Sequence, residues 1–324
     1  MRFLIVGAGI SGCVCAYQLS RSRHEVVLIE KGRGVGGRMA TRRMNGARID
    51  HGAQFMTIRS ARMKSLLSLW EGESAVIPWY DRIAGHPEIP IGIRYRGTTG
   101  MTDPAKYLAR FFDKELNFFV ERIERVETGW KIWERQGQFR ILNAEHLILA
   151  IPSVQILELL HRSSLYLPDE VMNGLKKIRH TRCIALMGLM ENSSQLPKPG
   201  TFTHPVEEID WISDNQVKGI SSKPCFTLHA SDDYSQQLWD APDEERVPKL
   251  LEVGQDCLGT KITQWVSHRW GFAKPTVTFG SSHWHSAEWA LTMVGDGFGG
   301  ERIENAALSG WDGAESILQT IQNL

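Results

Sequence analysis

Three glycines near the N-terminus have the spacing of a phosphate-binding turn. They form the pattern Gly7-x-Gly9-x-x-Gly12 directly after the apolar run Phe3 to Val6. In a dinucleotide-binding turn, the first glycine permits a tight bend, the second lets the backbone approach a pyrophosphate, and the third lets helix and strand pack closely. A helix beginning here presents free N–H groups and its positive dipole end to the phosphates. The pattern therefore predicts a dinucleotide site.

A second buried strand, Val26 to Ile29, follows the predicted helix and ends at Glu30. An acidic side chain about 20 residues after the glycines is suited to accept hydrogen bonds from ribose hydroxyls. A solvated charge at a strand end is the alternative interpretation of Glu30. Besides the three glycines, the residues assigned to the cofactor at these junctions are Ile10, Ser11, Glu30 and Lys31.

Two further motifs extend the prediction beyond a generic dinucleotide. Gly36-Gly37-Arg38, with Thr41 three residues later, resembles the second glycine motif of the amine-oxidase-like FAD flavoproteins. Arg38 is suited to balance pyrophosphate charge, although a surface arginine in a basic loop is the alternative. Gly295-Asp296-Gly297 resembles the element whose aspartate binds the ribityl chain in that family, although an ordinary Asp-Gly turn is the alternative. The resemblance implies noncovalent FAD.

The same resemblance assigns residues elsewhere to the cofactor. Asp50 to Phe55 resembles the stretch beside the flavin ring, and within it His51 is interpreted as structural. A helix beginning near Ile303 would point its positive end at the flavin and stabilise the anionic reduced form. The further cofactor assignments are Gln54, Phe55, Ile123 at adenine, Ala150 at the pyrophosphate, Asp296, Gly297 and Ile303.

Within this superfamily the chain most resembles the renalases, including their bacterial forms. The segments that carry this resemblance are Asp50 to Phe55, Gly97 to Met101, Trp211 to Asn215, His268 to Trp270 and Gly295 to Gly297. The resemblance implies an oxidase that converts 2-dihydro and 6-dihydro isomers of NAD(P)H to NAD(P)+, passing hydride to the flavin and forming hydrogen peroxide from O2. Because the flavin carries such chemistry, no catalytic side chain is expected.

Candidate substrate residues are less sharply defined by the sequence. Arg94, Tyr95 and Arg96 lie in an alternating stretch, where one face is suited to a nucleotide phosphate and solvent-facing charges are the alternative. His180, Trp211 and His283 are imidazole or aromatic candidates near the ring, and core or surface positions are the alternative for each.

Composition limits the partners. Lys plus Arg and Asp plus Glu number 37 each, so the formal net charge is zero and no basic footprint predicts nucleic acid or an anionic membrane. No apolar run is long enough to span a bilayer. The five cysteines lack metal-ligand spacing, so we expect reduced thiols, no metal and a cytoplasmic location. The expected partners are a dinucleotide substrate and O2, and the sequence leaves the oligomeric state open.

The predicted fold class is α/β. A discontinuous Rossmann-type FAD-binding domain is combined with a sheet-based α+β substrate domain, an architecture like that of p-hydroxybenzoate hydroxylase. We assign residues 1–58, 98–153 and 286–324 to the FAD-binding domain, and residues 59–97 and 154–285 to the substrate domain.

Two other functions remain open at this point. The first is another flavoenzyme on the same fold, such as an amine oxidase or a desaturase. The second is a regulatory module that binds NAD(P) without a flavin, against which the second glycine motif and the Gly295 to Gly297 turn both argue.

Overall fold

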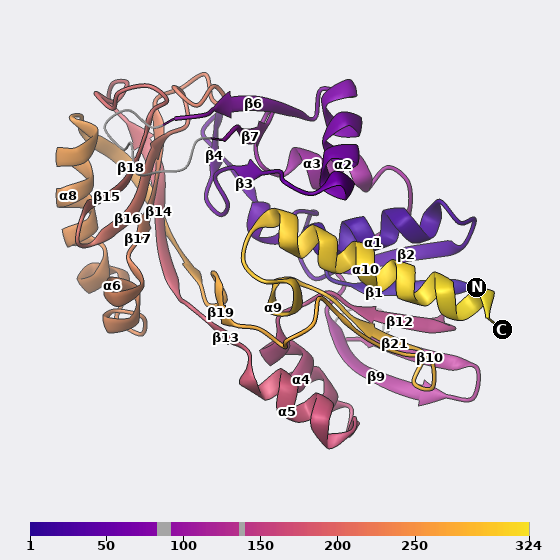
Figure 1. Cartoon of the computed structure of the whole chain (residues 1–324). Coiled ribbons are helices and arrows are strands. Elements are labelled where there is room, and N and C mark those ends of the chain that lie inside the picture. The colour runs from indigo at the N-terminus through magenta and orange to yellow at the C-terminus, as the bar shows by residue number, and fades with distance from the viewer. Residues whose placement is uncertain (83–91, 136–139, 324) are drawn as a thin grey trace.

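A computed structural model describes residues 1–82, 92–135 and 140–323 of the chain. Within these residues, one mixed sheet forms the dinucleotide-binding part (Figure 1), with the order β20-β21-β12-β1-β2-β8. Its strands are β1 (Arg2–Val6), β2 (Glu25–Glu30), β8 (Asp113–Leu116), β12 (His146–Leu149), β20 (Trp284–Ser286) and β21 (Leu291–Met293). All neighbours pair in parallel except β20 with β21, so the predicted Rossmann-type sheet is confirmed.

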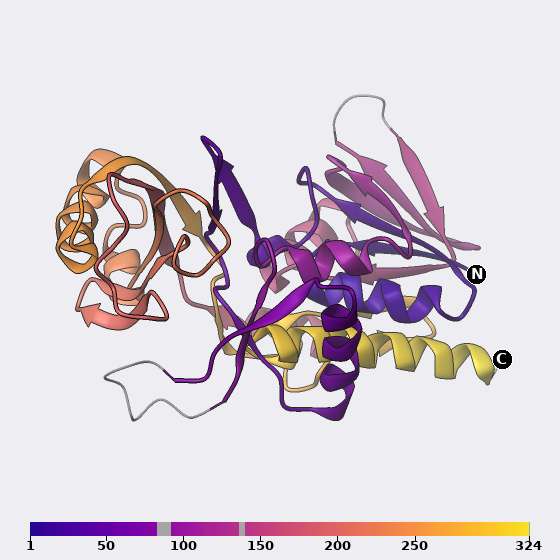
Figure 2. The same ribbon diagram turned by 90° about the horizontal axis from the view of Figure 1, so that it is seen from above.

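Two helices cover one face of this sheet. Helix α1 (Ile10–Ser20) follows β1, and helix α10 (Ile303–Gln322) packs along it. A Cβ on Gly310 would lie 2.1 Å from the Ser11 carbonyl oxygen, so α10 crosses α1 at a point where only glycine fits. Figure 2 shows the two helices side by side. The buried face of α10 carries small and apolar residues, including Ala306, Ala307 and Ala314, that belong to the same core as α1.

The opposite face is covered by an antiparallel unit and two helices. The unit comprises β9 (Val120–Val126), β10 (Gly129–Glu134) and β11 (Ile141–Ala144). Helices α4 (Ser153–Arg162) and α5 (Asp169–Lys177) share the same apolar core as these strands.

A second sheet lies at the other end of the molecule, with helices α6 (Asp232–Gln237) and α8 (Pro248–Leu258) on its outer side (Figure 1). Among the described residues its order is β15-β16-β17-β14-β18, and every pairing is antiparallel. The strands are β14 (Cys183–Met190), β15 (Thr201–Val206), β16 (Ile209–Asp214), β17 (Cys225–Ala230) and β18 (Ile262–Trp270). This sheet agrees with the predicted sheet-based second domain.

Short elements join the two sheets. They are η1 (Gly37–Met39), β3 (Thr41–Met44), β4 (Ala47–Asp50), β5 (Met56–Thr57), α2 (Ala61–Gly72), β6 (Val76–Tyr80), β7 (Arg94–Gly97), α3 (Asp103–Leu108), β13 (Arg179–His180), α7 (Asp243–Arg246), β19 (Pro275–Val277) and α9 (Asp296–Gly299). Strands β3 and β4 form a hairpin, and β5, β7 and β6 form a small sheet.

The domain boundaries remain a proposal, and packing argues for one adjustment. Helix α2 contributes Met63, Leu66 and Trp70 to the core that also contains α1, although we assigned residues 59–97 to the substrate domain. Helices α4 and α5 likewise pack on the dinucleotide-binding side. We therefore propose that these three helices belong to the FAD-binding domain. No helix in the described ranges has the length and apolarity needed to cross a membrane.

A histidine pair is buried beside the edge of the first sheet. The rings of His146 and His285 stack at 5.5 Å, and both bond the hydroxyl of Thr292. Burial, the neighbouring His285 and the Arg125 charge lower the pKa of His146 to about 3. Burial also lowers the pKa of His285. Both rings are therefore neutral in the folded protein near pH 7.

Because the folded protein keeps His146 and His285 neutral, we expect its free energy of unfolding to fall on acidification. The folded-state pKa of His146 lies below the unfolded value of about 6.5, so its contribution is complete above pH 6.5 and falls as the pH drops toward 3. At pH 5 the cost for this group is about 2 kcal/mol. Urea unfolding at pH 7.5 and pH 5 should show a smaller pH-dependent loss in His146→Gln than in the wild type. The exposed His161→Gln variant should match the wild type; an equal loss in all three proteins would contradict the assignment.

Candidate active site

The glycine turn lies between β1 and α1, as the sequence predicts. Gly7 has φ +109°, a left-handed conformation that glycine adopts without strain. A Cβ on Gly12 would lie 2.1 Å from the Gly7 carbonyl oxygen, which explains the third glycine. Ala150 borders the turn, because its carbonyl oxygen would lie 2.4 Å from a Cβ on Gly7. These predicted residues therefore meet at the carboxyl ends of β1 and β12.

The beginning of α1 fits a phosphate group. Gly9, its N-cap residue, has no atom within 4 Å of a Cβ built on it. No side chain caps the helix, and the buried Ser11 hydroxyl has no hydrogen-bond partner among the described residues. A buried polar atom without a partner is costly unless a ligand satisfies it. Ile10 is buried in the same turn. The residues present thus fit the diphosphate of a dinucleotide.

Glu30 is more than a solvated charge at a strand end. Its Oε2 accepts the Ala8 N–H at 2.9 Å, and its Oε1 accepts the Gly32 N–H at 2.7 Å. The Glu30 carboxylate thereby links the glycine turn to the loop after β2 by hydrogen bonds. Each oxygen keeps a second lone pair for a ribose hydroxyl. Lys31 is exposed at this junction.

Arg38 and Asp296 form an ion pair. Nη1 and Nη2 of Arg38 lie 2.5 Å from Oδ2 and Oδ1 of Asp296, and Nη1 also donates to the Phe272 carbonyl oxygen at 2.8 Å. Asp296 begins α9, which contains Gly297 and precedes Ile303 at the start of α10. The sequence assigned these two side chains to different parts of the cofactor, and it did not reveal that they bind each other.

The loop after β4 is tied to the second glycine motif. Ala53 donates its N–H to the Arg38 carbonyl oxygen at 2.8 Å, and a Cβ on Gly52 would lie 1.9 Å from that oxygen. The Gln54 amide turns back and donates to the Asp50 carbonyl oxygen at 2.6 Å. Gln54 and Phe55, both assigned to the flavin, are therefore held next to Arg38.

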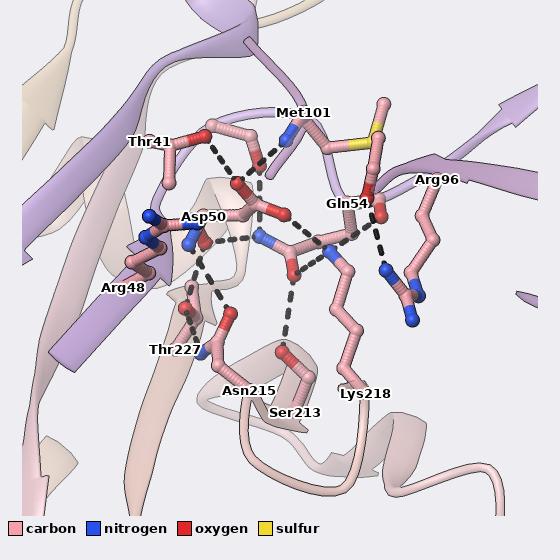
Figure 3. Close-up of polar contacts among 12 residues, drawn as sticks. Thr41, Arg48, Asp50, Gln54, Arg96, Met101, Ser213, Asn215, Lys218 and Thr227 are labelled. Atoms are coloured by element: carbon pink, nitrogen blue, oxygen red, sulfur yellow. Dashed lines mark hydrogen bonds and ion pairs between the residues drawn. The ribbon is translucent and has the colours of Figure 1, made fainter. Parts of the chain in front are cut away.

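Asp50 is the hub of this region (Figure 3). Its Oδ1 accepts the Thr41 hydroxyl at 2.6 Å and the Met101 N–H at 2.8 Å, and its Oδ2 accepts the Lys218 ammonium at 2.8 Å. Its backbone N–H and carbonyl oxygen bond to Asn215 and Thr227 of the second sheet. Asp50 and Lys218 are both completely buried.

Lys218 was not predicted from the sequence. Its Nζ donates to Asp50 and to the Gln54 carbonyl oxygen at 2.7 Å, and it lies 4.8 Å from the centre of the Trp79 ring. Burial lowers the pKa of the Lys218 ammonium, while the Asp50 carboxylate opposes that shift. Lysines are rarely buried, and nothing in the local sequence distinguishes this one from a surface lysine.

Four aromatic rings gather beside the loop of residues 52–55, and we call them the ring cluster: Phe55, Trp79, Tyr80 and Trp211. Centroid distances are 5.6 Å for Phe55–Trp211, 6.2 Å for Phe55–Tyr80, 4.7 Å for Trp79–Tyr80 and 6.5 Å for Trp79–Trp211. The guanidinium of Arg94 lies over Phe55 and Tyr80. Of the predicted substrate residues, Trp211 and Arg94 thus meet here.

Two other histidines lie near this region in neutral form. His180 contacts Phe272, and its Cε1 would lie 3.9 Å from a Cβ on Gly297; burial lowers its pKa. His51 stacks on Trp270 at 5.3 Å, and burial together with neighbouring His268 lowers the pKa of His51 to about 4. The packed environment of His51 agrees with its interpretation as structural.

The structure places other candidates apart. His283 bonds through Nε2 to Ser316 of α10, because β20 runs beside that helix. Tyr95 packs against the core of the first sheet. The Arg96 guanidinium bonds the carbonyl oxygens of Gly97 and Thr98. The Ile123 N–H donates to the Ser163 hydroxyl at 2.9 Å, so its adenine role remains a prediction.

Comparisons with known proteins support this arrangement. A family model described as an NAD(P)-binding Rossmann-like domain matches residues 5–70. The chain is 52% identical over 42 residues to L-amino acid oxidase of Cerastes cerastes, covering 13% of this chain and 8% of that protein. It is 36% identical over 95 residues to polyamine oxidase 1 of Oryza sativa subsp. japonica, covering 27% of this chain and 18% of that protein. The chain thus matches less than a fifth of the length of either relative.

A solved structure is similar over the whole chain. Cyclohexylamine oxidase from Brevibacterium oxydans IH-35A superposes with a TM-score of 0.76 at 13% identity, covering 99% of each chain. The chain has the fold of a flavin-dependent oxidase. The Rossmann-like match and this fold point to FAD as the cofactor, as the glycine motifs predicted.

Gly9 provides a test of cofactor placement. Gly9→Ala adds a methyl group where the protein has no nearby atom, so folding should be unchanged, but the methyl group should obstruct a bound pyrophosphate. We expect FAD affinity to fall by roughly tenfold or more, about 1.4 kcal/mol, measured by titrating the apoprotein with FAD. Gly34→Ala is the matched control, because a Cβ there also meets nothing within 4 Å. Equal FAD affinities for the two variants would indicate that the diphosphate does not bind at Gly9.

Removing Lys218 should strongly destabilise the protein. Lys218→Met leaves the Asp50 carboxylate buried without its cation, which typically costs about 3–5 kcal/mol. Urea unfolding should show this loss, and adding Asp50→Asn should restore part of it. Lys249→Met at the surface should change stability by less than about 1 kcal/mol. A similarly small effect for Lys218→Met would disprove the importance of the pair.

Proposed function

We propose that this protein is an FAD-dependent oxidase acting on the 2-dihydro and 6-dihydro isomers of NAD(P)H. In the balanced reaction, the dihydro substrate, O2 and one proton give NAD(P)+ and hydrogen peroxide. The oxidase fold and the glycine turn support the flavin-dependent part of this proposal. The resemblance of the segments around Asp50, Trp211 and Asp296 to the renalases supports the substrate.

The charge around the ring cluster is the observation that carries the substrate assignment. The Lys218 ammonium and the Arg94 guanidinium both lie over rings of the cluster, and Asp50 binds Lys218. Burial keeps His51 and His180 neutral by lowering the pKa of each. Two cations held over these rings disfavour a cationic amine there and favour a substrate with an uncharged ring and anionic phosphates.

The residues bind and orient, and the cofactor reacts. When bound, FAD supplies the hydride acceptor and the route for electrons to O2. Ser11 and the α1 N-terminus would hold its diphosphate, and Glu30 its ribose. Asp296 and Arg38 would hold the ribityl and diphosphate region, while Gln54 and Phe55 border the ring. A dihydropyridine already carries its hydride, so no side chain need first remove a proton.

A second candidate is an amine oxidase, which the partial match to polyamine oxidase 1 favours. The two candidates differ in the charge of the substrate at the ring. An amine must be accommodated as an ammonium or lose its proton, whereas a dihydronicotinamide ring is uncharged.

Anaerobic reduction of the bound flavin separates the candidates. The purified protein is mixed with chemically isomerised NADH, with ordinary NADH, with cyclohexylamine and with a polyamine. We expect rapid bleaching of the flavin absorbance by isomerised NADH alone, followed by hydrogen peroxide release when O2 is admitted. Rapid bleaching by an amine but not by isomerised NADH would establish the amine oxidase instead. A colourless protein that releases no flavin on denaturation would favour a regulatory module.

A further inference from the structure

Two polar atoms of the ring cluster are buried without partners. The indole Nε1 of Trp211 and the hydroxyl oxygen of Tyr80 have essentially no solvent exposure, and neither has a hydrogen-bond partner among the described residues. Trp211 as a whole is only 8% exposed. Buried N–H and O–H groups are normally hydrogen-bonded, and leaving one without a partner destabilises the folded protein. Two in one cluster indicate a ligand that accepts hydrogen bonds.

The two donors come from different segments but contact the same rings. Tyr80 ends β6 and Trp211 lies in β16, yet both contact Phe55 and Trp79. Other tryptophans with unpartnered Nε1 atoms lie in different settings. Trp70 is enclosed by the apolar core around α1 and α2. Trp133 lies under the Arg122 guanidinium at 4.4 Å.

The cluster also adjoins the predicted flavin ring site. Phe55 follows Gln54, and the same loop donates the Ala53 N–H to Arg38. Arg38 binds Asp296 of the C-terminal flavin element. A planar group resting on the ring cluster would therefore lie beside the residues assigned to the isoalloxazine ring.

The electrostatics of the cluster select an electron-rich, uncharged ring. The Lys218 ammonium lies 4.8 Å from the Trp79 ring centre and is fixed there by Asp50 and Gln54. A cation held against an aromatic ring satisfies the negative potential of that ring. Because the Arg94 guanidinium already lies over Phe55 and Tyr80, a further cation is disfavoured by repulsion, whereas an uncharged planar dihydropyridine can stack on the rings.

We propose that the ring cluster binds the nicotinamide group of the dihydro substrate, with the Trp211 indole N–H and the Tyr80 hydroxyl donating hydrogen bonds to its carboxamide oxygen. This assignment rests on the proposed function and adds the residues that recognise the reacting ring. It also accounts for the two unpartnered donors through a single acceptor group with two lone pairs.

The test uses variants that keep each aromatic ring and remove only the donor. Trp211→Phe and Tyr80→Phe holoenzymes are reduced anaerobically by isomerised NADH in a stopped-flow instrument. ADP-ribose, which has no nicotinamide group, is measured in parallel as a competitor. Trp133→Phe is the matched control, since it also removes an unpartnered indole N–H. Flavin absorbance and thermal unfolding midpoints establish that each variant is folded and loaded.

We expect each donor variant to raise the dissociation constant for isomerised NADH by roughly tenfold, about 1.4 kcal/mol, while the affinity for ADP-ribose stays unchanged. The Trp133→Phe control should behave as the wild type. Equal weakening of both ligands, or no change in either, would overturn the nicotinamide assignment while leaving the proposed function intact. Failure of isomerised NADH to reduce the wild-type flavin would instead refute the proposed function, and the inference with it.

Discussion

The two sheets of this protein are joined around one buried carboxylate. Asp50 cannot remain charged in the interior without compensation, because removing an ion from water costs several kcal/mol. Thr41, Met101 and Lys218 supply that compensation from three separate parts of the chain. Since Lys218 follows β16 of the second sheet, satisfying this single charge requires the second sheet to lie against the β3–β4 hairpin.

The candidate site follows from that constraint. Lys218 also bonds the Gln54 carbonyl oxygen and lies against Trp79, so the charge that neutralises Asp50 holds the loop of residues 52–55 and the ring cluster together. The Arg38–Asp296 ion pair likewise joins two segments that are far apart in the sequence, here at the glycine motifs assigned to the cofactor. The reacting ring would therefore lie between two ion pairs, each of which joins distant segments.

The sequence predicted the parts that obey local rules. The glycine turn at Gly7 and the strand ending at Glu30 follow spacings set by backbone geometry, and the structure confirms both. The sequence could not reveal the partners of Asp50, because nothing around Lys218 in the sequence distinguishes it from a surface lysine. The sequence also did not indicate that His283 bonds to Ser316 of α10, since its neighbours along the chain do not show that β20 runs beside that helix.

The close crossing of α1 and α10 at Gly310 has a consequence for biosynthesis. The glycine turn and α1 leave the ribosome before the second sheet, whereas α10, which packs on α1 at Gly310, emerges after that sheet. During translation, the face of α1 that packs on α10 is therefore exposed until α10 has been synthesised. Until α10 is synthesised, the nascent chain therefore offers a hydrophobic surface of the kind that chaperones recognise.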